Sequence, residues 1–153
     1  MKLYLVQHGE ACTKEENPDR PLTRKGKEDI ARLAAFIGNA GIEVGRVIHS
    51  GKLRAQQTAE ILCQCMAPGV ELETSSQINP NDPPRIFDWQ SGEQDMDRLV
   101  VGHLPFLARL VSLLLIENDE RILVAFSPGS MVCLDLDSGG QGLIRWMLRP
   151  ELL

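Results

Sequence analysis

The sequence lacks the features that would place the protein in a membrane, outside the cell or on nucleic acid. Its longest apolar run, around residues 110–116, is far shorter than the about 20 residues that a transmembrane helix needs. The first residues, MKLYLVQHGE, contain neither the long apolar region nor the small-residue cleavage site of a secretion signal. Acidic residues outnumber basic ones, 21 against 16, and the net charge of −5 argues against non-specific nucleic-acid binding. We therefore expect a cytoplasmic protein with no membrane partner and no nucleic-acid partner.

Cysteine is also scarce, and the spacing of the four cysteines fits no zinc site. Cys63 and Cys65 are two positions apart within a helical pattern, so their side chains face different directions. The other two, Cys12 and Cys133, are isolated in the sequence. We expect free thiols, and we predict neither a bound metal nor another cofactor.

Strand-like and helix-like segments alternate over the first two thirds of the chain. Residues 22–41 have the apolar spacing of an amphipathic helix. Thr23 is a suitable N-cap for this helix, and Gly38 or Gly41 can end it. The predicted strands are Lys2–Gln7, 44–50, 70–73 and 97–103, and the further predicted helices are 52–66 and 104–118.

The remaining segments complete the predicted fold. Three prolines in the first half of residues 78–95 indicate a loop with at most a short helix. Residues 121–127, 130–137 and 143–149 have the pattern of strands joined by Pro-Gly and Gly-Gly turns. We predict an α/β fold in which residues 1–153 form a single domain, with a mostly parallel central sheet flanked by helices on both faces. The closing strands are expected to extend that sheet through hairpins.

Polar residues follow three of the predicted strands and point to one site. They are Gln7-His8-Gly9, Ser50 with Arg54 nearby, and Gly102-His103. In a parallel sheet the carboxyl ends of the strands share one edge, where ligands bind. Arginine offers phosphate oxygens a fixed fork of donors, a helix amino terminus adds N–H groups, and histidine can act as nucleophile, acid or charge stabiliser. Each residue also has a structural interpretation: His8 as a histidine at a surface turn, His103 as a capping or core histidine, and Arg54 as an exposed helix residue. For His49 we favour a structural role.

The motifs LVQHGEA (5–11), RPLTRKG (20–26), HSGKLRAQQTAEIL (49–62) and LVVGHLPFLARL (99–110) resemble those of the histidine phosphatase superfamily, also called phosphoglycerate-mutase-like. The similarity is greatest to its short bacterial branch, the SixA-type phosphohistidine phosphatases, and it covers nearly the whole chain. It implies a phosphoglycerate-mutase-like fold and a metal-independent phosphatase.

The resemblance also implies roles for individual residues. His8 matches the nucleophile that becomes a transient phosphohistidine, and Arg54 matches the arginine that holds the phosphoryl oxygens. His103 matches the second histidine, which supports the charge of the transferring group. Arg20 matches a basic position that contacts phosphate or partner, and Ser50 matches a serine that we expect to form a turn rather than to catalyse. We further expect Gly9 to let the backbone turn sharply or approach the ligand closely.

Gln7 departs from the family pattern, which has arginine at this position. Glutamine donates hydrogen bonds but carries no charge, and the loss of a charged clamp can cost about 10²–10⁵ in rate. Two hypotheses follow: a phosphatase that acts on phosphohistidine in a protein, and a phosphate-binding or phosphoprotein-binding module that is weakened or inactive in catalysis. A mutase or a phosphatase of small phosphorylated substrates is a third possibility, disfavoured by the short chain.

No carboxylate has a spacing that marks it as the general acid, and Glu10 is only a weak candidate. A phosphohistidine substrate reduces the need for such an acid, because its leaving imidazole has a pKa of about 6.5 and is easily protonated. The core motifs are separated by no sizeable insertion that could form a lid. Because an open site suits a protein substrate better than a small metabolite, the partner that we expect is a phosphorylated protein of the histidine phosphotransfer type.

Overall fold

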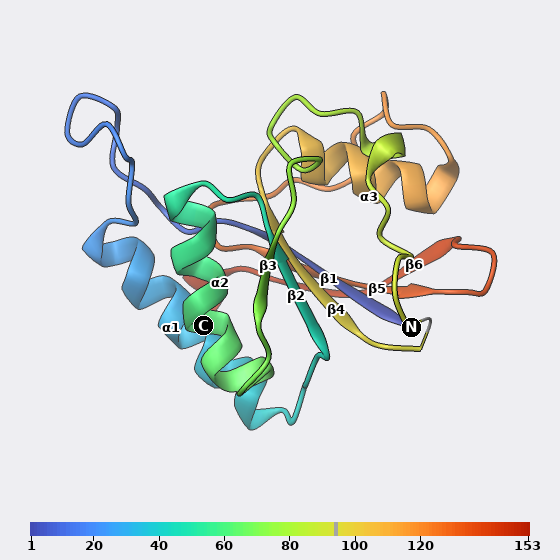
Figure 1. Cartoon of the computed structure of the whole chain (residues 1–153), viewed down its shortest axis with the longest axis horizontal. Helices are drawn as coiled ribbons and strands as arrows, with labels where there is room; N and C mark the ends of the chain where they lie inside the picture. The colour runs from blue at the N-terminus through green and yellow to red at the C-terminus, as the bar shows by residue number, and fades with distance from the viewer. Residues whose placement is uncertain (94) are drawn as a thin grey trace.

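A six-stranded sheet lies between two helical layers in the computed structural model, which describes residues 1–93 and 95–153 (Figure 1). The strand order is β3-β2-β4-β1-β5-β6. Strands β1, β2, β3 and β4 are parallel to one another, whereas β5 is antiparallel to β1 and forms a hairpin with β6. The strands are β1 Lys2–Gln7, β2 Arg46–His49, β3 Leu72–Thr74, β4 Arg98–Gly102, β5 Met131–Leu136 and β6 Gly142–Leu148; the helices are α1 Arg24–Asn39, α2 Leu53–Met66 and α3 Phe106–Ile116, with short 3-10 helices η1 Pro84–Ile86 and η2 Pro150–Leu152. The predicted α/β fold is confirmed.

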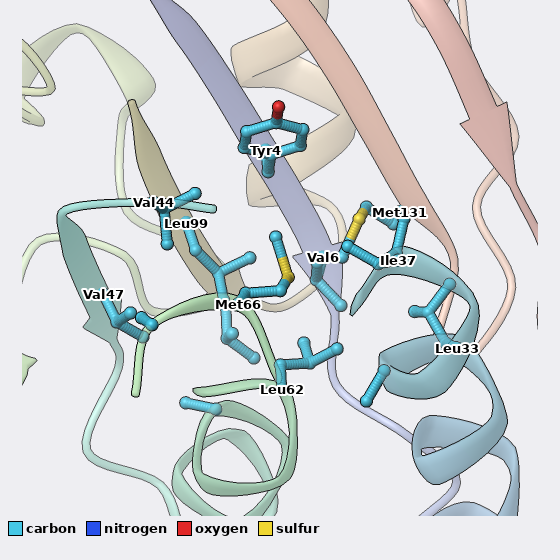
Figure 2. Packing of buried hydrophobic residues seen from close by; sticks show 14 of the residues in the cluster. Tyr4, Val6, Leu33, Ile37, Val44, Val47, Leu62, Met66, Leu99 and Met131 are labelled. Atoms are coloured by element: carbon cyan, nitrogen blue, oxygen red, sulfur yellow. The ribbon is translucent and has the colours of Figure 1, made fainter. Parts of the chain in front are cut away.

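The sheet is buried on both faces because alternate residues of each strand point to opposite sides. In β1, Tyr4 and Val6 join the core formed with α1 and α2, whereas Leu3 and Leu5 join the core formed with α3. Figure 2 shows the first of these cores, where side chains of α1 and α2 meet those of β1, β2, β4 and β5. Burial on two faces makes the central strands a rigid support for whatever follows their carboxyl ends.

Helix α1 begins at the predicted cap. The Thr23 hydroxyl oxygen accepts the Gly26 N–H at 2.9 Å. The helix ends at Asn39, and Gly41 follows with a positive φ of 68°. Gly26 faces the segment after β1: a Cβ there would lie 2.1 Å from the carbonyl oxygen of Glu10. The absence of a side chain thus lets the first turn of α1 touch the backbone next to His8.

The prediction of a strand at 121–127 is wrong. These residues form neither helix nor strand, and Ile122 and Leu123 are exposed. Val124 and Phe126 give the segment its strand-like pattern because they pack against the core on the α3 side. Strand β5, the next strand along the chain, is paired with β1 on one side and with β6 on the other, so the segment cannot pair beside it.

The other boundaries differ only slightly from the prediction. The short strand expected at 70–73 lies at Leu72–Thr74, and the loop at 78–95 contains η1, with position 94 outside the described residues. All four cysteines are free thiols, as predicted. Within the described ranges, no helix is both long enough and apolar enough to span a bilayer.

Candidate active site

Two histidines and an arginine come together at the carboxyl edge of the parallel strands. His8 follows β1, His103 follows β4, and Arg54 lies in the first turn of α2. The two imidazole rings are 4.9 Å apart between centroids and tilted by 55°. The guanidinium Nε of Arg54 lies 3.2 Å from Nε2 of His8. These residues are far apart in the sequence, and the fold gathers them into one cluster of side chains; we call the cluster of His8, Arg54 and His103 the cup.

The contacts of His8 determine which of its ring nitrogens carries the proton. Nδ1 lies 2.8 Å from the carbonyl oxygen of Gly9, which only accepts, so Nδ1 is the donor. Nε2 therefore holds the lone pair, toward which Arg54 donates. Burial is the largest of the effects that lower the pKa of His8 to about 4; the positive charges of Arg54 and Arg20 act in the same direction, and the Gly9 hydrogen bond opposes them. At neutral pH His8 is thus an uncharged imidazole with a free electron pair on Nε2.

His103 is held by Ser50. Its Nε2 is 2.5 Å from the Ser50 hydroxyl oxygen, and this oxygen accepts the backbone N–H of Lys52 at 3.4 Å. The pKa of His103 is lowered to about 3, mainly by burial and to a smaller extent by His8 and the surrounding cationic side chains. Nδ1 of this ring is buried and has no hydrogen-bond partner among the described residues. Ser50, which we expected only to form a turn, therefore contacts the second histidine directly.

Positive charge gathers around the cup although the whole chain is acidic. Arg54, Arg20 and Lys52 all lie close enough to lower the pKa of His103. Burial and the charge of Arg20 lower the pKa of Arg54 itself, so a bound anion would relieve this repulsion. Arg20 is anchored by its Nε, which donates to the carbonyl oxygen of Cys12 at 3.0 Å. Lys52 was missed in the sequence analysis, although it lies at the N-cap of α2, inside the motif HSGKLRAQQTAEIL.

Gln7 adds no charge to this group. Its backbone is hydrogen-bonded to the loop before β5. The Gln7 N–H donates to the Ser130 carbonyl oxygen, and the Gln7 carbonyl oxygen accepts the Gly129 N–H, each at 3.1 Å. The side-chain oxygen Oε1 is buried and finds no hydrogen-bond partner in the part of the chain that the structure describes.

Gly9 has a packing reason to be glycine. A Cβ at this position would lie 2.9 Å from Cγ1 of Ile30 and 3.2 Å from the carbonyl oxygen of Gly26. The Gly9 N–H donates to the Thr58 hydroxyl oxygen at 3.0 Å, and the Thr58 hydroxyl donates to the Arg54 carbonyl oxygen at 2.8 Å. Gly9 is thus needed because helix α1 packs closely against the backbone at this position. Thr58 was also missed; its signal is the last position of LRAQQT.

Two further polar residues beside the cup are engaged locally. Glu10, the weak candidate for a general acid, accepts the Thr23 hydroxyl at 2.8 Å. His49 is buried, and its Nδ1 accepts the Gly51 N–H at 3.0 Å in a turn where Gly51 has a φ of 80°. These contacts fit the structural role expected for His49. No three His, Cys, Asp or Glu side chains form a metal-binding group within residues 1–93 and 95–153.

Comparisons with known proteins place this geometry in a family. The model of the histidine phosphatase superfamily (branch 1) matches residues 3–79. The chain belongs to the histidine phosphatase superfamily. Phosphohistidine phosphatase SixA of Escherichia coli K12 is 26% identical over 159 residues, which cover 98% of this chain and 94% of the relative. An uncharacterized protein of Picosynechococcus is 32% identical over 119 residues, covering 70% of this chain and 68% of the relative.

Solved structures agree with this assignment. The structure of the protein histidine phosphatase SixA complexed with tungstate has a TM-score of 0.86 and 25% identity, and the alignment covers 99% of each chain. The α-ribazole phosphatase of Shigella flexneri shares the fold, with a TM-score of 0.72, 17% identity and coverage of 98% and 97%. The chain is therefore of the SixA type within the superfamily, and its similarity to SixA supports a phosphatase function.

Proposed function

We propose that this protein removes the phosphoryl group from phosphohistidine in a partner protein, without a metal, through a phosphohistidine intermediate at His8. The observation that carries the proposal is the free electron pair on Nε2 of His8, which faces the Arg54 guanidinium in a cup of cationic side chains. Residues 1–153 would act as one histidine-phosphatase-like domain, in keeping with the coverage of 99% in the SixA alignment. The cytoplasmic location stays a prediction.

The reaction has two displacements at phosphorus. In the first, the Nε2 electron pair of His8 forms a bond to phosphorus while the bond from phosphorus to the substrate imidazole breaks. That imidazole leaves with the bonding pair and takes up a proton from water. In the second, water attacks phosphorus, the P–Nε2 bond breaks, and His8 regains its electron pair as inorganic phosphate leaves. Catalysis of this kind depends on positioning and on neutralising the charge of the equatorial oxygens.

Each residue of the cup has a role in these steps. Arg54 would hold the phosphoryl oxygens with its remaining N–H donors, and Arg20 and Lys52 would add positive charge. Because Ser50 already accepts the Lys52 N–H, its own hydroxyl hydrogen can be donated to Nε2 of His103. In that arrangement the ring proton of His103 would lie on Nδ1, which has no hydrogen-bond partner among the described residues, and Nδ1 would then donate to a phosphoryl oxygen.

The choice of phosphohistidine as substrate rests on the leaving group and on a relative. Imidazole is protonated easily, whereas an alkoxide leaving group needs an acid, and Glu10 is occupied by the hydroxyl of Thr23. The E. coli relative is named for phosphohistidine.

A second candidate function is a phosphoprotein-binding module without turnover. It is favoured by Gln7, a neutral residue at the position where the family has arginine. Arg54, Arg20 and Lys52 would still hold a phosphoryl group, while the weaker neutralisation of charge in the transition state would slow its transfer.

The deciding experiment compares wild type, Gln7→Arg and His8→Ala on a phosphohistidine-containing phosphotransfer domain. We expect wild type to release inorganic phosphate and to show a trapped phosphohistidine at His8, and we expect His8→Ala to do neither. If wild type and His8→Ala are equally inactive while Gln7→Arg is many times faster, the binding module is the correct function. Efficient turnover of a small phosphate ester, with phosphohistidine proteins left intact, would contradict the proposed substrate.

A further inference from the structure

The backbone of His8 is held from two sides. Its N–H donates to the Gly102 carbonyl at 3.1 Å, which continues the pairing of β1 with β4. On the other side, the Gly129 N–H lies 3.1 Å from the Gln7 carbonyl oxygen and 3.2 Å from that of His8, and the Gln7 N–H donates to Ser130 at 3.1 Å. The loop before β5, residues 127–130, is therefore hydrogen-bonded to the backbone where β1 ends. None of its residues has a part in the reaction described above.

Two serines close this loop. The Ser127 N–H donates to the Ser130 hydroxyl oxygen at 2.9 Å, and the two hydroxyl oxygens are also 2.9 Å apart. The Ser130 N–H returns to the Ser127 carbonyl at 2.8 Å. Ser130 is fully buried, so its polar atoms depend on these partners. The ring of hydrogen bonds fixes the position of the Gly129 N–H between its two ends.

Glu151, in η2, sets the direction of the hydroxyl bonds. Its carboxylate oxygens lie 3.2 and 3.4 Å from the Ser127 hydroxyl. An ionised carboxylate only accepts, so Ser127 gives its single hydroxyl hydrogen to Glu151, and the Ser130 hydroxyl must then donate to Ser127. The same 3-10 helix is pressed against the loop, because a Cβ on Gly129 would lie 2.8 Å from Cγ of Pro150.

We propose that Ser127, Ser130 and Glu151 are positioning residues, which hold the end of β1 so that Nε2 of His8 points at the phosphoryl group. This inference rests on the proposed function, since it takes His8 as the nucleophile. We assign none of the three residues a contact with the substrate. A displacement of a reacting group by about 1 Å can cost about 10²-fold in rate, so loosening the loop slows the attack while the cations still bind phosphate.

The test measures kcat, KM and the single-turnover formation of phospho-His8 in the full chain. We expect Ser127→Ala, Ser130→Ala and Glu151→Gln to lower kcat by about 10-fold to 10²-fold with KM little changed. Ser127→Thr keeps a hydroxyl and should restore the rate. The matched controls are Ser112→Ala, which removes another buried serine hydroxyl bound to a carbonyl, and Glu28→Gln, which removes an exposed carboxylate paired with an arginine. Both controls should keep the wild-type kcat.

Nitrogen NMR of the His8 ring separates failure of this inference from failure of the proposed function. If wild type forms no phospho-His8, the proposed function is wrong, yet the ring signals still report whether the loop variants shift the titration and proton position of His8. The inference is overturned if the three variants match the Ser112→Ala control in kcat and leave the His8 titration unchanged. If Ser130→Ala does not fold, Glu151→Gln decides, because its side chain is half exposed.

Discussion

Arg54 donates from its Nε to Nε2 of His8 at 3.2 Å, although 46 positions separate the two residues. The bond joins the only ring nitrogen of His8 that holds a lone pair to a permanent positive charge. The hydrogen bond orients the imidazole, and the charge of Arg54 adds to the effect of burial in lowering the pKa of His8. An incoming phosphoryl group would take the place between the two side chains, bonded to one and held by the other.

Loss of this guanidinium should slow phosphoryl transfer. We expect Arg54→Gln to reduce the rate of phospho-His8 formation by about 10²–10⁵-fold, because one charged clamp on the transferring group is removed. Rapid-quench measurement of the phosphoenzyme tests this. The control is Arg24→Gln, which changes an exposed arginine of α1 that pairs with Glu28. A variant at position 54 with the wild-type rate would contradict the assigned role.

The ring of His8 should titrate far below an ordinary histidine. Burial and the nearby arginines lower its pKa to about 4, compared with about 6.5 for a free side chain. Nitrogen NMR should show a neutral ring at pH 7 with the proton on Nδ1. In Arg54→Gln the pKa should rise, since one of the charges that lowers it is gone. Titration of the wild-type ring near 6.5, or a proton on Nε2, would show that the described environment of His8 is wrong.

Both histidines should make the fold sensitive to mild acid. Their pKa values, about 4 for His8 and about 3 for His103, lie below the value of about 6.5 in the unfolded chain. As the pH falls below 6.5, the unfolded chain binds protons that the folded chain refuses, so the stability present above that pH is lost. Between pH 7 and pH 5 the loss should be about 2 kcal/mol for each histidine.

Urea unfolding at the two pH values measures this loss. The variant His103→Asn should lose about 2 kcal/mol less than wild type between pH 7 and pH 5, because one titrating group is absent. The carboxylates are the same in both proteins and contribute equally to the two differences. An identical pH dependence in the two proteins would refute the low pKa of His103.

Replacing Gly26 with alanine should destabilise the protein, although the same change ordinarily stabilises a helix. Replacement of glycine by alanine inside a helix usually adds about 1 kcal/mol of stability. Here the new Cβ would lie 2.1 Å from the Glu10 carbonyl oxygen, and such overpacking costs about 1–3 kcal/mol. We therefore expect Gly26→Ala to lower the free energy of unfolding, and Lys27→Ala, at the exposed neighbouring position, to leave it nearly unchanged. A stabilised Gly26→Ala would mean that α1 does not touch this backbone.

The regular elements were predictable where the pattern of apolar residues had one cause. The continuous apolar run in β1 reflects burial on both faces of the sheet, and the spacing in α1 reflects burial on one face of a helix. Thr23 was predictable as a cap because its contact with Gly26 is local. The segment 121–127 was mistaken for a strand because Val124 and Phe126 are buried without any pairing of the backbone.

The sequence by itself determined which chemical groups are available and which edge of the sheet they occupy, since parallel strands must deliver His8, Arg54 and His103 to the same side. Only the tertiary structure decided how those groups are prepared. The proton of His8 is assigned by a carbonyl oxygen, the pKa values by burial, the contact of Ser50 with His103 by the approach of β2 to β4, and the grip on the end of β1 by the loop at Gly129. Most of these contacts join residues distant along the chain, and neither their distances nor the dielectric around them is written in any local pattern of residues.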